Sequence, residues 1–176
     1  MRLLLDTHSL LWFLLGDKAL SQPAKQAILD PNHAKLVSPA SYWEIAIQIS
    51  LGKYTLHHPF EAFWSHGLKQ TGFQVLPVEV RHAAIVATLP FHHRDPFDRL
   101  LIAQAASDNL TVVSADEQFD SYGVATHLVV SVRSETNTTG TVPLRRSLRR
   151  SSASGELPFD QHCLSQSGHT VARPTK

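Results

Sequence analysis

The sequence predicts an α/β domain with a mostly parallel sheet, and three observations support this prediction. Short apolar runs of strand length alternate along the chain with longer segments of helical periodicity. The first run, residues 2–5, ends abruptly at Asp6, which suits a buried parallel strand that delivers a carboxylate to the edge of a sheet. Helix-start signals, in which a proline follows a serine or an aspartate, occur where the pattern changes.

The first part of the chain is expected to run strand, helix, helix, strand. Residues 2–5 form the first strand, and helical spacing over residues 10–14 predicts the first helix. A second helix is expected over residues 21–30, with Pro23 in its first turn. Residues 35–38 then predict a short strand.

A third helix is expected to begin at Ser38 and Pro39, with serine as the N-cap and proline at the first helical position. Gly52 is expected to end this helix. Residues 59–72 predict another helix and residues 73–76 another strand. The face of the third helix is formed by Tyr42, Ile45, Ala46 and Ile49.

Residues 80–89 predict a further helix, and residues 95–98 open the clearest helix of the chain. Residues 110–114 are rich in β-branched side chains and predict a strand that leads to Asp116. A short turn or helix and a last strand near Val124 complete the alternation. The helix that begins at 95–98 is expected to bury a narrow stripe made of Leu101, Ile102, Ala105 and Ala106.

The charge distribution separates an acidic body from a basic tail. Residues 1–128 contain 9 Lys or Arg against 12 Asp or Glu, whereas residues 129–176 contain 7 against 3. The tail is rich in Ser, Thr and Arg without sustained periodicity, so we expect one domain over residues 1–128 followed by a disordered segment. A read-through terminus and an RNA-attracting arm, whose contacts would be Arg145, Arg146, Arg149 and Arg150, both account for this tail.

The composition excludes several classes of protein. Cys163 is the single cysteine, which rules out an intramolecular disulfide framework and a cysteine-rich metal site. The N-terminus has no cleavable signal pattern, and no apolar run approaches the roughly 20 residues that span a bilayer. We therefore expect a soluble, cytoplasmic protein without a membrane partner.

Four acidic residues are placed where strands end and helices begin. Asp6 and Asp116 follow apolar strands, and Glu44 and Asp98 fall in the first two turns of helices that such strands would feed. Ligands of open α/β sheets bind in the crevice beyond the carboxyl ends of the strands, so these four side chains are candidates for one site.

Carboxylates that share a crevice repel one another and raise their pKa values unless a cation lies between them. Oxygen ligands select Mg²⁺ or Mn²⁺, and Mg²⁺ usually takes one or two carboxylates, several waters and the oxygens of a phosphate substrate. The four acids therefore predict a phosphoryl-transfer site that depends on a divalent metal.

Each acid also has a structural explanation. Asp6 can cap the helix that follows it, and Glu44 can be a solvated charge paired with a Lys or Arg. Asp95 and Asp98 have the spacing of a capping box around Pro96, and Asp116 can be an ordinary turn residue after a strand.

Four segments of the chain resemble the PIN-domain toxins of the VapC type. They are residues 3–8 (LLLDTH), 41–46 (SYWEIA), 93–103 (HRDPFDRLLIA) and 113–116 (VSAD), and both their order and their spacing agree. The resemblance covers residues 1–128 and implies a three-layer PIN fold with about five mostly parallel strands flanked by helices. It also implies cleavage of RNA with Mg²⁺ or Mn²⁺, a cognate antitoxin and a homodimer.

By the same resemblance, Asp6, Glu44, Asp98 and Asp116 are the catalytic and metal-binding acids. Asp95 belongs to the longer Asp-Pro-Phe-Asp form found in one branch of the family. The tail departs from similar chains, which end soon after the last strand.

Two alternative functions remain open. A degenerate PIN domain would bind RNA or protein without cutting it. An aspartate-based phosphatase also places an aspartate after its first strand, but its usual second aspartate two positions later is His8 in this chain.

A few other side chains have simpler expected positions. His92 and His93 are expected to be solvated rather than metal ligands or proton donors. Arg99 is expected to be a surface charge, with an RNA phosphate as its alternative partner. Trp12 and Trp64 are expected to lie in the core or in protein contacts rather than to stack on bases.

Overall fold

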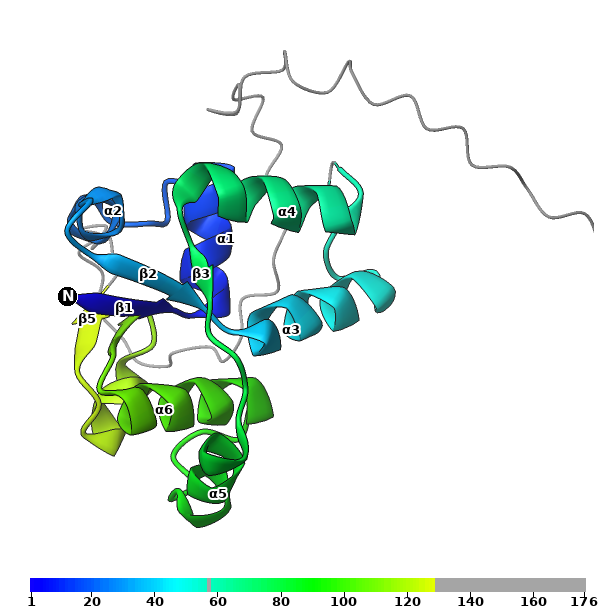
Figure 1. The fold of residues 1–176 in the computed structure, drawn as a ribbon. Coiled ribbons are helices and arrows are strands. Elements are labelled where there is room, and N and C mark those ends of the chain that lie inside the picture. Colours follow the sequence, from blue (N-terminus) through cyan, green and yellow to red (C-terminus); the bar gives the residue numbers. More distant parts are fainter. Residues whose placement is uncertain (57, 129–176) are drawn as a thin grey trace, which may run out of the picture.

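The computed structural model describes residues 1–56 and 58–128 (Figure 1). The tail expected over residues 129–176, with its arginines, lies outside the described residues. Within the described part of the chain, every helix is too short or too polar to cross a bilayer.

The centre of the fold is a sheet of five strands in the order β3-β2-β1-β4-β5. All four strand pairings are parallel, so the predicted fold class is confirmed, and the sheet is more uniform than the mostly parallel one that was expected. β3 is shorter than its predicted range of 73–76. The strands are β1 (Arg2–Leu5), β2 (Ala34–Val37), β3 (Gln74–Val75), β4 (Thr111–Ser114) and β5 (Thr126–Leu128).

Helices cover both faces of the sheet and complete three layers (Figure 1). α1, α2 and α4 lie on one side of the sheet, and α5 and α6 lie on the other. The predicted caps are confirmed at Ser38 and Asp95, whose side chains accept backbone N–H groups of the helices that follow them. Ser21, where the second helix was expected to start, is also an N-cap. The helices are α1 (Thr7–Leu15), α2 (Gln22–Leu29), α3 (Pro39–Ser50), α4 (Phe60–Thr71), α5 (Val80–Thr88), α6 (Pro96–Asp108) and the 3₁₀ helix η1 (Glu117–Tyr122).

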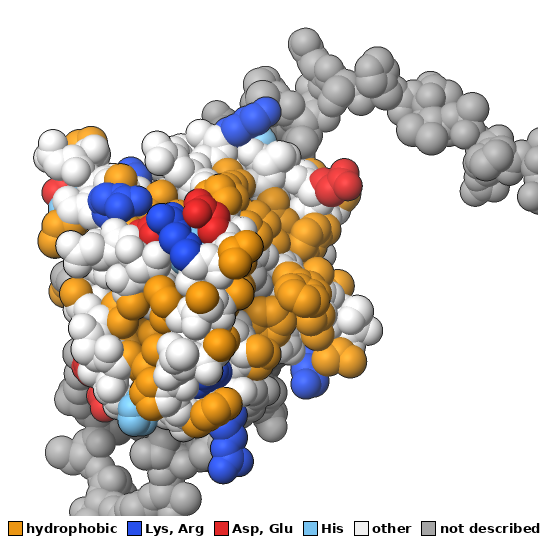
Figure 2. Space-filling view, turned by 60° about the horizontal axis from the view of Figure 1, so that its bottom comes forward, with side chains coloured by type: hydrophobic (Ala, Val, Ile, Leu, Met, Phe, Trp, Pro, Cys, Tyr) orange, Lys and Arg blue, Asp and Glu red, His pale blue; other side chains and the backbone are white. Residues whose placement is uncertain are grey.

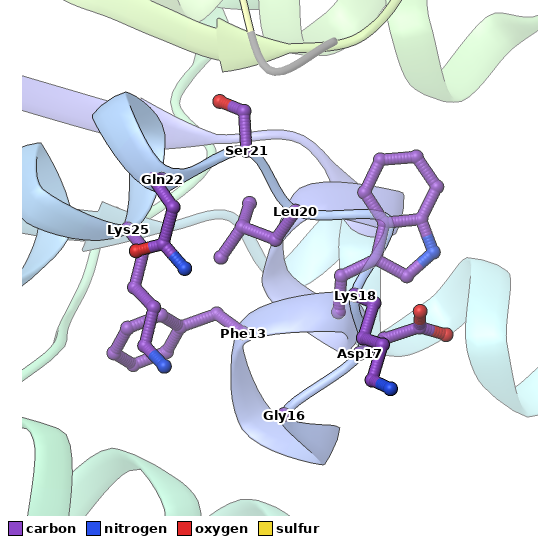
Figure 3. Close-up of a pocket in the computed structure, with 9 residues that line it drawn as sticks. Phe13, Gly16, Asp17, Lys18, Leu20, Ser21, Gln22 and Lys25 are labelled. Carbon is purple, nitrogen blue, oxygen red and sulfur yellow. The ribbon is translucent and has the colours of Figure 1, made fainter. Parts of the chain in front are cut away.

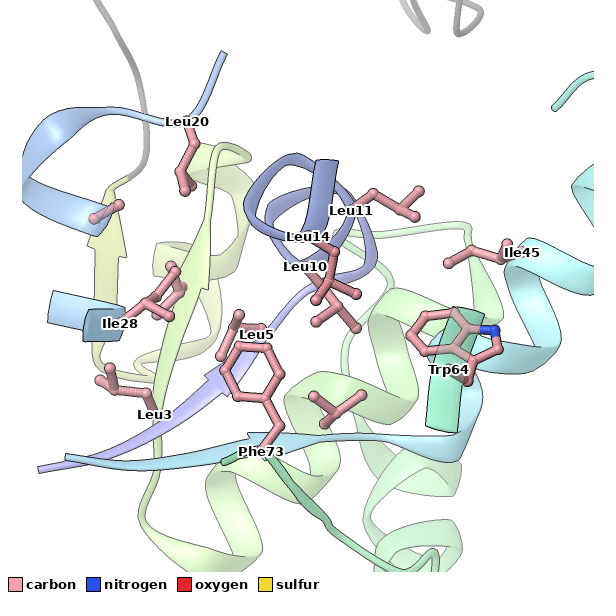
Figure 4. Close-up of a cluster of buried hydrophobic side chains, with 13 residues drawn as sticks. Leu3, Leu5, Leu10, Leu11, Leu14, Leu20, Ile28, Ile45, Trp64 and Phe73 are labelled. Atoms are coloured by element: carbon pink, nitrogen blue, oxygen red, sulfur yellow. The ribbon is translucent and has the colours of Figure 1, made fainter. Parts of the chain in front are cut away.

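The first strand contributes to the core on both sides of the sheet. Leu3 and Leu5 are fully buried in the cluster under α1, α2 and α4 (Figure 4), and Leu4 is fully buried in the cluster on the α6 side. Successive side chains of a strand point to opposite faces, so a strand buried on both faces needs the unbroken apolar run seen in the sequence. Burial of β1 therefore fixes the position of Asp6 at its end.

α6 is buried over a wider surface than its sequence predicts. Residues 101–105 are all buried, and Ala106, which was expected in the apolar stripe, is exposed. The helix packs against α5 and α3 as well as the sheet, so a narrow apolar stripe cannot cover all of its contact surface. The side-chain amide of Gln104 is buried and donates to the carbonyls of Leu76 and Pro77, both at 3.3 Å.

Arg99 is a buried structural residue, so its predicted positions at the surface or on an RNA phosphate are wrong. Its side chain donates to the carbonyls of Val86 at 3.0 Å, Leu89 at 2.9 Å and Pro90 at 2.7 Å, and it lies 4.1 Å from the ring centre of Phe91. The last carbonyls of a helix have no partner within the helix, and Arg99 satisfies them at the end of α5. It thereby anchors the first turn of α6, which carries Asp98.

We expect Arg99→Lys to lower the free energy of unfolding by about 2 kcal/mol, because a lysine keeps the charge but cannot reach three carbonyls with a rigid fork of donors. Urea unfolding of the full chain measures this change, and Arg94→Lys at the exposed neighbouring arginine is the matched control. Equal stability of the two variants would contradict this role of Arg99.

Candidate functional site

The strand order reverses beside β1, which has β2 on one side and β4 on the other. A crevice beyond the carboxyl ends of such strands is the usual ligand site of an open α/β sheet. Asp6 follows β1 directly, and its backbone N–H donates to the carbonyl of Val113 in β4 at 3.1 Å. Asp116 follows the end of β4 by two residues, so both aspartates lie at this reversal point.

Asp6 is buried and caps α1. One of its carboxylate oxygens, Oδ1, accepts the backbone N–H of Ser9 at 2.7 Å. The capping explanation from the sequence is therefore correct. It does not remove Asp6 from the site, because a carboxylate has a second oxygen and further lone pairs. The cap holds the side chain at the end of the sheet.

Glu44 lies half-buried on α3, and the burial raises the pKa of its carboxyl group. The Thr7 hydroxyl and the charge of His8 oppose this effect, whereas the charges of Asp95 and Asp6 raise the pKa further. Among the described residues, no Lys or Arg forms an ion pair with Glu44. The expected alternative of a solvated, paired charge is therefore wrong.

Asp98 is half-buried in the first turn of α6, and its pKa is raised from an ordinary 3.8 to about 8. Burial is the largest cause, and the charges of neighbouring carboxylates add to it. The fold thus places the other three predicted acids, from separate elements, close enough to Asp98 for their charges to act on it. The carboxylates that raise the pKa of Asp98 are those of Asp95, Glu44, Asp6 and Asp116.

Asp95 has both a capping and an electrostatic role. Its Oδ1 accepts the backbone N–H of Phe97 at 3.0 Å, which is the N-cap position predicted from the sequence. Its charge also raises the pKa values of Glu44 and Asp98. We therefore define the carboxylate cluster as Asp6, Glu44, Asp95, Asp98 and Asp116.

Asp116 is the more exposed of the two aspartates at the strand ends, with 44% of its side chain exposed. Its Oδ1 accepts the backbone N–H of Gln118 at 2.8 Å and so caps η1, as the turn explanation predicted. Its Oδ2 lies 3.3 Å from Nε2 of His93. An ionised carboxylate can only accept, so the ring nitrogen donates in this contact.

His93 is buried, which corrects the expectation that it is solvated, whereas His92 is exposed as expected. The ring of His93 stacks on Tyr122, with centroids 5.5 Å apart, and meets Phe119 at 5.0 Å. Its backbone N–H donates to the Tyr122 hydroxyl at 2.7 Å. These partners lie 23 to 29 residues away along the chain, so local sequence patterns could not reveal them.

The carboxylate cluster fits a hydrated divalent cation. Its donors are all oxygens, and a cation would relieve the repulsion that raises the pKa of Asp98. Among the described residues, no three His, Cys, Asp or Glu side chains converge closely enough to enclose a metal ion. Mg²⁺ and Mn²⁺ need only one or two protein carboxylates, because water and phosphate oxygens complete their coordination.

The pocket between the end of α1 and the start of α2 lies elsewhere (Figure 3). It has a volume of about 220 Å³ and is lined by Phe13, Leu20 and Lys25 among others, with no member of the carboxylate cluster. The carboxylate cluster is therefore separate from this pocket.

Comparisons with known structures agree with the fold described above. Similar solved structures are VapBC2 from Rickettsia felis bound to a promoter DNA fragment (12% identity, TM-score 0.57, covering 73% of this chain and 98% of that chain) and VapBC-1 from nontypeable Haemophilus influenzae (15%, 0.52, 73% and 98%). FitAB bound to an IR36 DNA fragment is also similar (22%, 0.51, 72% and 94%). No curated protein matches the chain.

The family comparison covers most of the described residues. The profile of the PIN domain matches residues 3–125, which is more than half of the chain and spans all five members of the carboxylate cluster. The resemblance seen in the sequence is thereby confirmed, and the chain belongs to the PIN domain family.

Proposed function

We propose that this protein is a divalent-metal-dependent endoribonuclease and the toxin of a toxin–antitoxin pair. The observation that carries the proposal is the carboxylate cluster, in which four acids raise the pKa of Asp98 at the strand reversal of a PIN domain. Structural groups seldom gather so much like charge, because the repulsion opposes folding. A site that takes a cation and a phosphate gives this arrangement a function.

In this proposal Asp6, Glu44, Asp98 and Asp116 hold Mg²⁺ or Mn²⁺. A bound divalent ion supplies a water of lowered pKa and neutralises charge on the scissile phosphate. The N–H groups of Ser9 and Gln118 orient the carboxylates of Asp6 and Asp116. His93 holds the second oxygen of Asp116, as a hydrogen-bond partner behind a ligand usually does.

An antitoxin partner is supported by the relatives and by the surface. The similar structures of Rickettsia felis and Haemophilus influenzae are VapBC proteins. Figure 2 shows hydrophobic side chains gathered over the face formed by α5 and α6, and Val80 and Phe91 are 87% and 82% exposed. Exposed apolar surface of this kind is typical of protein contacts. The homodimer implied by the resemblance remains a prediction.

The test is incubation of the purified full chain with bulk RNA in Mg²⁺, in Mn²⁺ and in excess chelator. We expect cleavage with either metal and none in chelator, because a phosphate of the RNA cannot approach the negatively charged cluster without a neutralising cation. Gel analysis of the RNA measures the result, and metal added back after chelation should restore cleavage.

Three outcomes would contradict the proposal. Cleavage that persists in chelator would exclude the metal-dependent mechanism. Metal-stimulated RNA binding without cleavage would favour the degenerate PIN domain, and hydrolysis of a phosphate monoester instead of RNA would favour the aspartate-based phosphatase.

A further inference from the structure

Trp43 is a large aromatic side chain left open beside the carboxylate cluster. It is 66% exposed, whereas Trp64 is 6% exposed in the core and Trp12 is half-buried. The burial of Trp64 agrees with its predicted place. Burial of an indole is favourable, so packing among the described residues does not account for the exposure of Trp43.

The exposed indole is held in place by one aromatic neighbour. The ring centres of Trp43 and Phe97 lie 5.7 Å apart with planes at 83°, which is a favoured edge-to-face geometry. This contact restrains the ring while about two thirds of the residue stays open to solvent. A restrained aromatic surface loses little conformational freedom when a flat partner stacks on it.

The Trp43–Phe97 pair joins the two helices that carry half-buried acids. Trp43 precedes Glu44 on α3, and Phe97 precedes Asp98 on α6. Consecutive residues of a helix point about 100° apart, so the aromatic pair lies beside these carboxylates and not on the opposite side of the helices. A strand whose phosphate lies at the cluster would bring a neighbouring base towards the indole.

The charge of the site also favours a base as the partner of Trp43. The carboxylates repel a polyphosphate chain, and residues 1–128 have more acidic than basic side chains. RNA binding here would therefore gain from an attraction that does not depend on charge. Stacking of bases on aromatic side chains is such an attraction, and it tolerates any base because every base has a π-face.

We propose that Trp43 is a stacking platform for a nucleobase of the RNA strand, next to the phosphate that is cleaved. The proposal rests on the proposed function, because it takes the carboxylate cluster as the place of that phosphate.

The first test is kinetic and uses the full chain with an oligoribonucleotide that contains a cut site mapped in bulk RNA. We expect Trp43→Ala to raise KM roughly tenfold with a smaller change in kcat, and Trp43→Phe to restore most of the loss. Leu51→Ala is the matched control, because Leu51 is a 59% exposed apolar residue at the other end of α3. It should leave both constants unchanged.

The second test moves the change to the RNA. An abasic nucleotide is placed in turn at each position around the cut site, and cleavage by the wild type should fall at one position. Trp43→Ala should lose nothing further at that position, since the stacking partner is already missing. This scan does not depend on whether the alanine variant is slightly less stable.

The third test measures binding without cleavage. Poly(A) and poly(U) are added to Asp6→Asn protein with Mg²⁺, and stacking should quench tryptophan fluorescence. Most of this quenching should disappear in the double variant that also carries Trp43→Phe, because Trp43 is far more exposed than the half-buried Trp12 and the buried Trp64.

The outcomes separate this proposal from the proposed function. Suppose that the wild type cleaves RNA, that no abasic position lowers its cleavage, and that Trp43→Ala has an unchanged KM. These results would overturn the stacking role and leave the proposed ribonuclease function intact. Quenching through Trp43 without any cleavage by the wild type would support stacking and overturn the ribonuclease. A change in oligomeric state in Trp43→Ala, with RNA binding intact, would identify a protein contact and overturn the stacking role.

Discussion

Replacement of Asp6 by asparagine is expected to lower kcat/KM for RNA cleavage by at least about 100-fold, because a neutral amide holds a divalent cation poorly and metal catalysis contributes several kcal/mol. Asparagine is as good an N-cap as aspartate, so the hydrogen bond from Ser9 can be kept. Loss of activity would therefore report the lost charge and not a lost helix start. Initial rates on the mapped oligoribonucleotide measure the effect.

Glu61→Gln is the matched control for this experiment. Glu61 is an exposed acid in the first turn of α4, outside the carboxylate cluster, and its replacement removes the same charge. It should cleave at the wild-type rate. Full activity of Asp6→Asn, with metal dependence unchanged, would exclude Asp6 from the site.

Replacement of Asp98 by asparagine is expected to stabilise the metal-free protein at neutral and higher pH. The pKa of Asp98 is raised from 3.8 to about 8 in the folded chain, so its ionisation opposes folding. Each pKa unit corresponds to about 1.4 kcal/mol. Asparagine has nearly the same shape and no charge, and it should raise Tm by at least roughly 5 °C at pH 8, since about 4 °C corresponds to 1 kcal/mol in a domain of this size.

The pH dependence gives the sign of this effect. Below pH 4 the Asp98 carboxyl is protonated in both the folded and the unfolded chain, and its contribution to stability is fully present. As pH rises from about 4 to about 8, the unfolded chain releases the proton and the folded chain keeps it, so stability is lost. The gain in Tm of Asp98→Asn over the wild type should therefore be small at pH 4.5 and large at pH 8.

Thermal unfolding in chelator and in Mg²⁺ or Mn²⁺ separates the two roles of Asp98. Added metal should stabilise the wild type by mass action and the variant less. If Asp98 only interacts favourably with the dipole of α6, its replacement should cost roughly 0.3 to 1 kcal/mol and leave the metal response intact. A lower metal-free Tm with a full metal response would remove Asp98 from the metal site. Glu61→Gln again serves as the control.

Much of the fold could be predicted from local patterns. The run at residues 2–5, the helix start at Ser21, the caps at Ser38 and Asp95, and the helical periodicities all lie within a few residues of the elements they predict. Such patterns work because a strand or a helix turn involves neighbours along the chain. The capping explanations for Asp6 and Asp95 were also correct, for the same reason, and Asp116, which was explained as a turn residue after a strand, caps η1.

Predictions were wrong where long-range packing decides the position of a side chain. Arg99 was expected at the surface, but its partners are the carbonyls at the end of another helix. His93 was expected in solvent, but Phe119 and Tyr122 enclose it from a segment beyond the next strand. Neither burial can be read from neighbours in sequence, since each depends on how α6 and η1 pack against the sheet.

The sequence by itself determined the α/β class, the order of the elements, the resemblance to the PIN family and the identity of the candidate acids. Only the tertiary structure decided that Asp6, Glu44, Asp95 and Asp116 lie near enough to Asp98 for their charges to raise its pKa. The same is true of the open indole of Trp43 beside them. The physical reason is that hydrogen bonds and periodicity act over a few residues, whereas burial and repulsion between charges depend on distances set by the whole fold.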